Sequence, residues 1–392
     1  MNQPLEPAGL LSRAFGVCFA ANMLQGVAFN LFLHLPGHLH NLGASDLEIG
    51  WIAGLTAIAA ILLRAPLGRA MDRRGRRPII LWGGVVNSVA VLGYLLVDSI
   101  GPLLYAVRIL HGLAEAMLFT ALFTYAADHV PSRTRTQGLA LFGVSGMLPI
   151  ALAGAIGDWL IPLRGYDAIF ELALALAVCS WLLSLALPEH WAAHDGKEAG
   201  GGLRATITQR DLLSLWWIGA VFSVALTAFF VFIRRFVDET GIGSVGLFFT
   251  AYTVAALILR VGFGWLPDRV GPRRVLAPAL AALAVGFLQM AAADSASDLV
   301  IAGVLCGVGH GYTFPILFAM VVSRASEARR GRAMAVYTAL FDVGVLLGGP
   351  VFGAIVEGLG FSLMFATAGA FVAFGAVVFF VWDARVRRLM LQ

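Results

Sequence analysis

Arg64-Ala-Pro-Leu-Gly68-Arg-Ala-Met-Asp72-Arg73-Arg-Gly75-Arg-Arg77 ends one long apolar run just before the next begins at Pro78. The stretch Arg260-Val-Gly-Phe-Gly264-Trp-Leu-Pro-Asp268-Arg269-Val-Gly271-Pro-Arg273 repeats its Arg, Gly, Asp, Arg, Gly and Arg at the same spacings, 196 residues later. A loop that merely collects arginines would explain the charge but not the shared Gly and Asp positions. The repeat therefore predicts a chain built from two related halves.

The composition is typical of a membrane protein. Hydrophobic residues make up 59% of the 392 residues and charged residues only 13%, which leaves too little polar surface for a soluble domain of this length. The net charge of +4 lies mainly in short loops between apolar runs, so it is an orientation signal and no nucleic-acid partner is expected. Cys18, Cys179 and Cys306 lie far apart in apolar runs, so neither a disulfide framework nor a zinc site is predicted.

Apolar stretches of about 20 residues, the length that crosses roughly 30 Å of hydrocarbon, follow one another along the chain. There are twelve, at residues 12–34, 46–68, 78–98, 102–127, 137–160, 166–187, 212–233, 244–267, 275–294, 298–322, 333–357 and 361–382. We therefore predict an all-α integral membrane protein with twelve transmembrane helices in two pseudo-symmetric six-helix bundles. Residues 1–187 would form the first bundle, residues 188–211 a cytoplasmic linker, and residues 212–392 the second bundle.

The basic residues favour one orientation of these spans. With the N-terminus inside, 21 of the 27 Lys and Arg residues fall in inside segments and only three fall outside. Because positively charged short loops stay in the cytoplasm, we expect both termini to be cytoplasmic in a cell (inner or plasma) membrane. The remaining three, Arg64, Arg108 and Arg260, lie within or at the ends of spans and need partners there.

The chain resembles the major facilitator superfamily over its whole length. It has six plus six spans, a central linker, and the loop signature Gly-x3-Asp-Arg-x-Gly-Arg-Arg at residues 68–77, with a weaker copy at 264–274. Arg108-Ile-Leu-His111-Gly112 is similar to the family's helix 4 signature Arg-x-x-Gln-Gly, with His in place of Gln. The resemblance implies the fold of that family and a central cavity lined by helices 1, 4, 7 and 10.

A glycine-rich run typical of drug:proton antiporters is present in part. Helix 5 carries Gly146-Met-Leu-Pro149 and Gly154, and helix 11 carries the fuller form Asp342-x-Gly344-x3-Gly348-Gly349-Pro350-x-x-Gly353. The chain thus looks most like the twelve-helix arabinose-efflux and drug:proton antiporter type.

The repeated loop is interpreted as a gating latch. A carboxylate beside a helix N-terminus is stabilised by the helix dipole, arginines can pair with acids on the neighbouring half, and glycine allows close packing. The alternative is a purely topological arginine cluster. The gating candidates are Gly68, Asp72, Arg73, Gly75, Arg76, Arg77, Asp268 and Arg269.

Ionisable residues inside the spans are candidates for proton coupling, because a buried charge in a membrane is costly and usually faces a cavity or a partner. Arg108, His111 and Glu115 are spaced i, i+3, i+7 on one face of helix 4, where a structural ion pair is the alternative. His310-Gly311 repeats His111-Gly112 with an offset of 199, so we expect the two histidines to face each other across the cavity. Asp342 on helix 11 completes the set.

Polar and aromatic residues of helices 1, 7 and 10 are candidates for the substrate cavity, although aromatic side chains on such helices more often serve in packing. These candidates are Asn22, Gln25, Asn30, Ser223, Thr227, Phe230 and Tyr312. The outside run His34-Leu-Pro-Gly-His38-Leu-His40 raises a metal hypothesis, but Pro36 disrupts helical spacing there. We predict no metal site and no cofactor.

The expected function is secondary active transport of a small organic solute by alternating access, with proton-coupled efflux as the favoured mode. The alternative is a uniporter or an importer of a polar nutrient or metal complex. No hydrolase or metalloprotease motif is present, so no enzyme activity is expected. The expected partners are the solute, protons and the lipid bilayer, and we expect a monomer.

Overall fold

The computed structural model describes residues 12–130, 135–188, 203–325 and 329–390. These residues form helices joined by short turns and loops, and no strand occurs among them. The all-α prediction is therefore confirmed. Most of the predicted linker, residues 189–202, lies outside the described residues, so the predicted bundle boundaries stay a prediction.

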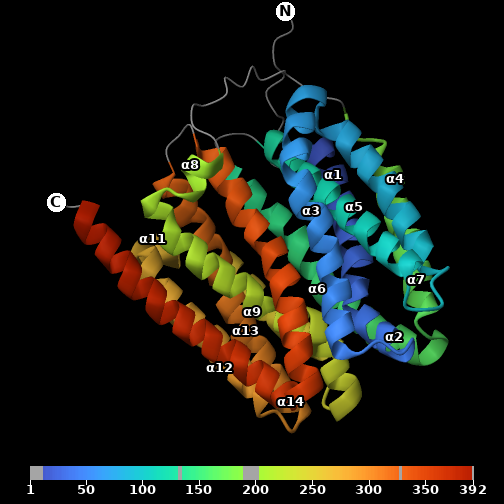
Figure 1. Cartoon of the computed structure of the whole chain (residues 1–392). Helices are drawn as coiled ribbons and strands as arrows, with labels where there is room; N and C mark the ends of the chain where they lie inside the picture. The colour runs from blue at the N-terminus through green and yellow to red at the C-terminus, as the bar shows by residue number, and fades with distance from the viewer. Residues whose placement is uncertain (1–11, 131–134, 189–202, 326–328, 391–392) are drawn as a thin grey trace, which may run out of the picture.

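The helices before that gap are called the N-terminal half, and they lie together on one side of the molecule (Figure 1). They are α1 (Arg13–Asn30), which continues through the 3-10 turn η1 (Leu31–His34) into α2 (Leu35–Asn41), then α3 (Asp46–Arg74), α4 (Arg76–Tyr94), α5 (Pro102–Asp128), α6 (Arg135–Arg164) and α7 (Asp167–Ser184). Ser45 and Glu48 form a capping box that starts α3, as a Ser at the N-cap with Glu three residues later predicts.

The helices after the gap follow a similar order, and α9 to α14 are called the C-terminal half. The helices after the gap are the short α8 (Leu203–Ile207), then α9 (Arg210–Thr240), α10 (Val245–Gly262), α11 (Leu266–Val270), α12 (Pro272–Ala291), α13 (Ala296–Arg324) and α14 (Arg330–Met390). Gly360, with φ 81°, interrupts α14 and lets the chain fold back on itself (Figure 1).

Ten segments among the described residues are long and apolar enough to span a membrane. One of them runs from Arg332 to Val386 and contains the break at Gly360, while α4, with 19 residues, is not among the ten. The protein is therefore a multi-pass membrane protein, and the count of twelve spans remains a prediction.

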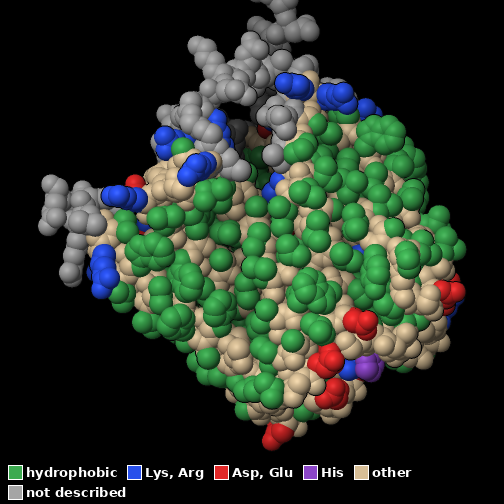
Figure 2. Space-filling model, in the orientation of Figure 1, with side chains coloured by type: hydrophobic (Ala, Val, Ile, Leu, Met, Phe, Trp, Pro, Cys, Tyr) green, Lys and Arg blue, Asp and Glu red, His purple; other side chains and the backbone are tan. Residues whose placement is uncertain are grey.

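The two ends of the bundle differ in charge. The turns at Gly75 and Gly271 mark the arginine-rich end, and the turns at Gly43, Gly241 and Gly360 mark the opposite end. Figure 2 shows basic side chains around the first end, acidic side chains at the second, and a wide apolar belt between them. This pattern fits a protein that crosses a bilayer from one end to the other.

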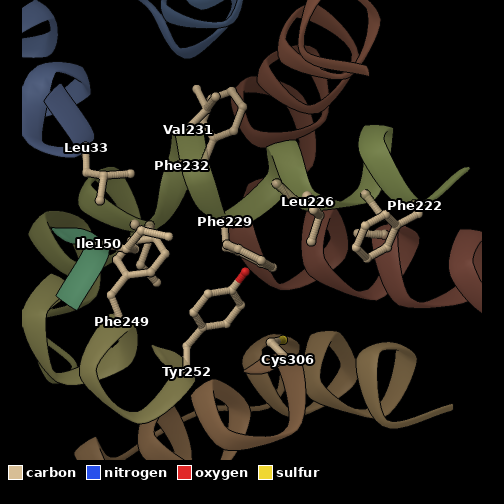
Figure 3. Packing of buried hydrophobic residues seen from close by; sticks show 14 of the residues in the cluster. Leu33, Ile150, Phe222, Leu226, Phe229, Val231, Phe232, Phe249, Tyr252 and Cys306 are labelled. Atoms are coloured by element: carbon tan, nitrogen blue, oxygen red, sulfur yellow. The ribbon is translucent and has the colours of Figure 1, made fainter. Parts of the chain in front are cut away.

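The hydrophobic core joins the two halves at the opposite end. The larger cluster combines Leu33 and Ile150 of the N-terminal half with Phe229, Phe249 and many other residues of the C-terminal half (Figure 3). The second cluster contains only residues of the N-terminal half and lies toward the arginine-rich end. Among the described residues, the cluster that combines both halves therefore packs them together at the opposite end.

Glycines bring the two halves into backbone contact at that same end. A Cβ placed on Gly50 of α3 would clash with the backbone of Gly349 of α14, and one on Gly154 of α6 would lie 3.0 Å from the Gly246 Cα of α10. No larger residue would allow these helices to approach so closely. Figure 2 shows a recess at the arginine-rich end, beside basic side chains, and we call this recess the hollow.

Candidate functional site

An ion pair joins the two halves between α3 and α14. The Arg64 guanidinium of α3 donates through Nε to the Asp342 carboxylate of α14 at 2.9 Å, and its Nη2 contacts the same oxygen. The two side chains are 19% and 18% exposed. Arg64 lies 18 residues into α3, about 27 Å from the opposite end at 1.5 Å per residue. The pair therefore joins the halves well inside the molecule, beyond the last glycine contact.

Glu115 connects this pair to a further charge, that of Arg108. The half-buried Glu115 of α5 interacts electrostatically with Asp342, Arg108 and Arg64. The four groups come from α3, α5 and α14 and comprise two positive and two negative side chains. We call Arg64, Arg108, Glu115 and Asp342 the charge cluster. When all four are ionised, the cluster has no net charge, which is the arrangement that makes charges tolerable inside a membrane.

Arg108 is held by groups of its own half. Its Nε donates to the Ile52 carbonyl at 3.2 Å, and its Nη1 donates to the Tyr94 hydroxyl at 3.2 Å. The same hydroxyl is also hydrogen bonded to His111 Nδ1, 3.2 Å away. The other ring nitrogen, His111 Nε2, is buried with no hydrogen-bond partner among the described residues. The face of α5 that carries Arg108 and His111, the fourth predicted span, thus forms a chain of hydrogen bonds through Tyr94. It does not form a simple Arg108 to Glu115 pair.

His310 has a similar environment in the other half. Its Nδ1 is hydrogen bonded to the Tyr252 hydroxyl of α10, and its ring packs against the edges of Phe222 and Phe314, with centroids 5.3 and 6.1 Å away. His111 packs against Phe32 of its own half, with centroids 4.5 Å apart. Each histidine therefore packs within its own half. The expectation that they face each other across the cavity stays a prediction.

The polar side chains of α1 point toward neighbouring helices. Asn22 donates to the Ser145 hydroxyl of α6 at 2.9 Å, and the buried Gln25 accepts from Asn87 of α4 at 3.1 Å. Asn30 donates to a backbone carbonyl of its own helix at 2.8 Å. Of these three cavity candidates, Asn22 and Asn30 keep partial exposure.

Ser223 and Thr227 of α9 lie in the contact with α14. They are 2% and 1% exposed, and a Cβ on Gly348 would lie 3.1 Å from the Thr227 Cβ. Their hydroxyls donate to backbone carbonyls of α9 itself, Ser223 at 2.5 Å and Thr227 at 3.2 Å. In this conformation both residues serve packing between helices, so the structure does not bring them to the hollow.

The aromatic candidates also lie in packed surroundings. Phe230 is half-buried and packs on Phe249 and Tyr252, with ring centroids 5.4 and 6.2 Å away. The Tyr312 hydroxyl donates to the Phe263 carbonyl at 3.1 Å. These contacts lie within the C-terminal half.

The first copy of the repeated loop is fixed to its own half. Arg76 pairs with Asp128 at the end of α5, with Nε and Oδ2 2.9 Å apart, and Arg77 donates to the Leu185 carbonyl at 3.1 Å. Gly75 has φ 85°, which explains why a glycine ends α3 here. Arg73 is exposed, and the surroundings of Gly68 and Asp72 are not among the described features of the chain.

The second copy leads to a residue that sequence reasoning missed. Asp268 and Arg269 are exposed, with Arg269 lying 5.4 Å above the Trp265 ring. Further along, Arg273 lies 3.1 Å from Asp383, near the end of α14. Asp383 has no exposed area and also accepts from Arg324 at 2.5 Å. Its position directly after the last predicted span, 361–382, gave no sequence signal that it is buried.

Comparisons with known proteins agree with this architecture. The family model described as Major Facilitator Superfamily matches residues 15–244 and 236–389. The chain is 22% identical over 366 residues to the "Staphylopine export protein" of Staphylococcus aureus, covering 90% of each chain. It is 23% identical to the "Uncharacterized MFS-type transporter YhhS" of Escherichia coli, covering 90% of this chain and 87% of that one.

Solved structures show the same fold at low sequence identity. The nucleoside transporter NupG superposes with a TM-score of 0.76 at 14% identity, covering 95% of this chain and 99% of that one. The human organic anion transporter MFSD10 (TETRAN) superposes with a TM-score of 0.72 at 18% identity, covering 96% of this chain and 100% of that one.

Proposed function

The chain belongs to the major facilitator superfamily and is a secondary transporter, and from that premise we propose that it exports a small organic solute in exchange for protons. The observation that carries this proposal is the charge cluster, in which the Arg64 to Asp342 ion pair joins the halves beside Glu115. Transport by alternating access requires that ligand and proton occupancy bias the same movement between the halves.

The charge cluster offers a physical basis for coupling. One proton on Glu115 or Asp342 would leave the cluster with a net charge of +1, and a proton on Asp342 would also weaken its pairing with Arg64. Since Arg64 and Asp342 belong to different halves, proton binding there would change the free energy of the contact between the halves. We therefore propose Glu115 and Asp342 as the coupling acids, with Arg64 and Arg108 as their partners.

The direction of transport is proposed from charge and similarity. The positive-inside rule supports a cytoplasmic arginine-rich end, the end at which α1 starts and α14 ends, so the hollow would face the cytoplasm. A hollow facing the cytoplasm can take up solute for export and release protons. The similarity to a protein named as an exporter supports the same direction.

The first step of the test is a thermal-shift screen of the purified protein against metabolites and drugs, because a bound ligand raises the apparent stability of the folded state. A hit is then assayed in proteoliposomes for accumulation driven by an imposed pH gradient and for counterflow without one. Glu115→Gln and Asp342→Asn should lose gradient-driven accumulation and keep counterflow, since exchange needs no net proton movement.

Glu171→Gln is the matched control, because Glu171 is 54% exposed and pairs with Arg164 at the surface. It should accumulate solute like the wild type. If both cluster variants and their double variant accumulate solute fully, the coupling acids lie elsewhere. Uptake that follows the solute gradient alone would instead favour the uniporter or importer.

A further inference from the structure

Two acids at the opposite end each bind a helix of the other half. The Asp158 carboxylate near the end of α6 accepts from the Gly246 amide at 2.6 Å, and Gly246 is the second residue of α10. The Glu357 carboxylate of α14 accepts from the Leu47 amide at 3.2 Å, and Leu47 is the second residue of α3. The first amides of a helix lack partners within the helix and favour negative charge. Each acid therefore caps a helix across the contact between the halves.

The two contacts are related by the internal repeat. Glu357 follows Asp158 by 199 residues, and Gly246 follows Leu47 by the same 199 residues. In one contact the acid belongs to the N-terminal half and the amide to the C-terminal half, and in the other contact the reverse holds. A pseudo-twofold axis between the halves requires this arrangement. An accidental surface contact would not be expected to occur twice with the same offset.

Close backbone packing accompanies both contacts. A Cβ on Gly353, one turn before Glu357, would lie 2.9 Å from the Leu47 Cα, and one on Gly154, one turn before Asp158, would lie 3.0 Å from the Gly246 Cα. Both carboxylates are therefore held where the helices touch.

Arginines of α9 strengthen the same region. Arg234 lies 3.9 Å from Asp158 and 5.8 Å above the Tyr166 ring, and Arg235 pairs with Asp46 of α3 at 3.0 Å. All these contacts join the two halves at the opposite end.

We propose that Asp158 and Glu357 are a pair of symmetry-related latches that hold the opposite end closed, and that their release sets how often this end opens. The proposal rests on the alternating-access part of the proposed function and requires neither proton coupling nor a particular solute. Opening this end must break both carboxylate to amide contacts, so the latches contribute directly to the free-energy difference between the two conformations.

The two latches differ in expected strength. The Asp158 side chain is only 20% exposed and also lies near Arg234, so Asp158→Asn should raise the open to closed ratio about tenfold, the range of a hydrogen bond to a charged group. Glu357 is exposed, so Glu357→Gln should raise the ratio about threefold, the range of a surface charge at a helix end. Because the two sites share no partner, the double variant should multiply these factors.

The experiment measures the opening directly. Ser99→Cys, in the turn before α5, and Ser297→Cys, in the first turn of α13, place spin labels at exposed positions of the two halves at the opposite end. The background has the exposed Cys179 replaced by Ser. Distance distributions are recorded by double electron–electron resonance in lipid nanodiscs, without solute and at constant pH. Asp158→Asn, Glu357→Gln and the double variant should populate a longer distance, with the largest shift in the double variant and the smallest in Glu357→Gln.

Glu239→Gln is the control, since Glu239 is an exposed acid at the same end that pairs with Arg235 of its own helix, 3.7 Å away. It should give the wild-type distribution. Glu357→Asp keeps the charge but shortens the reach, so it supplies a second latch variant and should shift the same way if Asp158→Asn does not fold.

The latches are overturned if the folded Asp158 and Glu357 variants all match the Glu239→Gln distribution. Because this readout uses neither a solute nor a pH gradient, loss of proton coupling in the transport assay would leave it unaffected. A failed transport assay and a failed latch test can therefore be told apart.

Discussion

Asp383→Asn tests the buried charge network of the C-terminal half at the arginine-rich end. The Asp383 carboxylate has no exposed area, accepts from Arg324 at 2.5 Å and from the Ser214 hydroxyl at 3.0 Å, and lies 3.1 Å from Arg273. The amide keeps the shape of the side chain but removes the negative charge from two guanidinium groups.

The magnitude follows from burial. Removing one partner of a fully buried ion pair costs about 3 to 5 kcal/mol, because the other charge is left without compensation. Here Arg324 and Arg273 are 15% and 25% exposed and can recover some hydration, so we expect a loss of about 2 kcal/mol in unfolding free energy. At about 2 °C per kcal/mol for a large chain, the melting temperature should fall by about 4 °C.

The assay is thermal unfolding of the purified protein in one detergent, followed by size-exclusion chromatography. Asp268→Asn is the control, since Asp268 is an exposed acid at the same end and should leave the melting temperature unchanged. In a double-mutant cycle, Arg324→Met should cost less in the Asp383→Asn background than in the wild type. If Asp383→Asn has the same melting temperature as Asp268→Asn, or if the effects of Asp383→Asn and Arg324→Met are additive, the network does not stabilise this end.

Three further outcomes are expected. Tyr94→Phe should lower the unfolding free energy by about 1 to 2 kcal/mol, measured by thermal shift, because Arg108 and His111 both lose their shared hydroxyl. Gly349→Val should prevent the close approach of α3 to α14 and so abolish solute accumulation in proteoliposomes, while a surface change such as Leu347→Val should not. Reporter fusions after residues 75 and 270 should be cytoplasmic and one after residue 240 external; an external reporter at residue 75 would contradict the proposed orientation.

The sequence by itself was enough to predict that the protein lies in a membrane, that it is all-α and that it contains an internal repeat. Long apolar runs require helices in a bilayer, because each backbone amide and carbonyl must find a partner within its own segment. The constant offset between the Arg64 and Arg260 stretches indicated two related halves, and no knowledge of three-dimensional contacts was needed for this. The local signals were equally direct where they depended on neighbours in the chain, as with Ser45 at the start of α3 and Gly75 at its end.

The candidate site was only partly within reach of the sequence. Arg64 and Asp342 were each conspicuous as charges within or at the ends of apolar runs, yet their pairing depends on how α3 meets α14 across 278 residues of chain. His111 and His310 are related by the sequence repeat, but the repeat did not indicate their neighbours. Phe32 packs against the ring of His111 and Phe222 against the ring of His310, each within its own half.

Only the tertiary structure decided which charges meet. Asp158, Glu357 and Asp383 lie near the ends of helices, where sequence reasoning assigns an acid to the solvent. Their partners are two helix N-termini of the other half and two arginines brought close by packing. The energy of an electrostatic contact depends on the distance between the two groups and on how far the surrounding protein excludes water. Hydrophobicity along the chain specifies the helices, whereas their packing in three dimensions sets those distances.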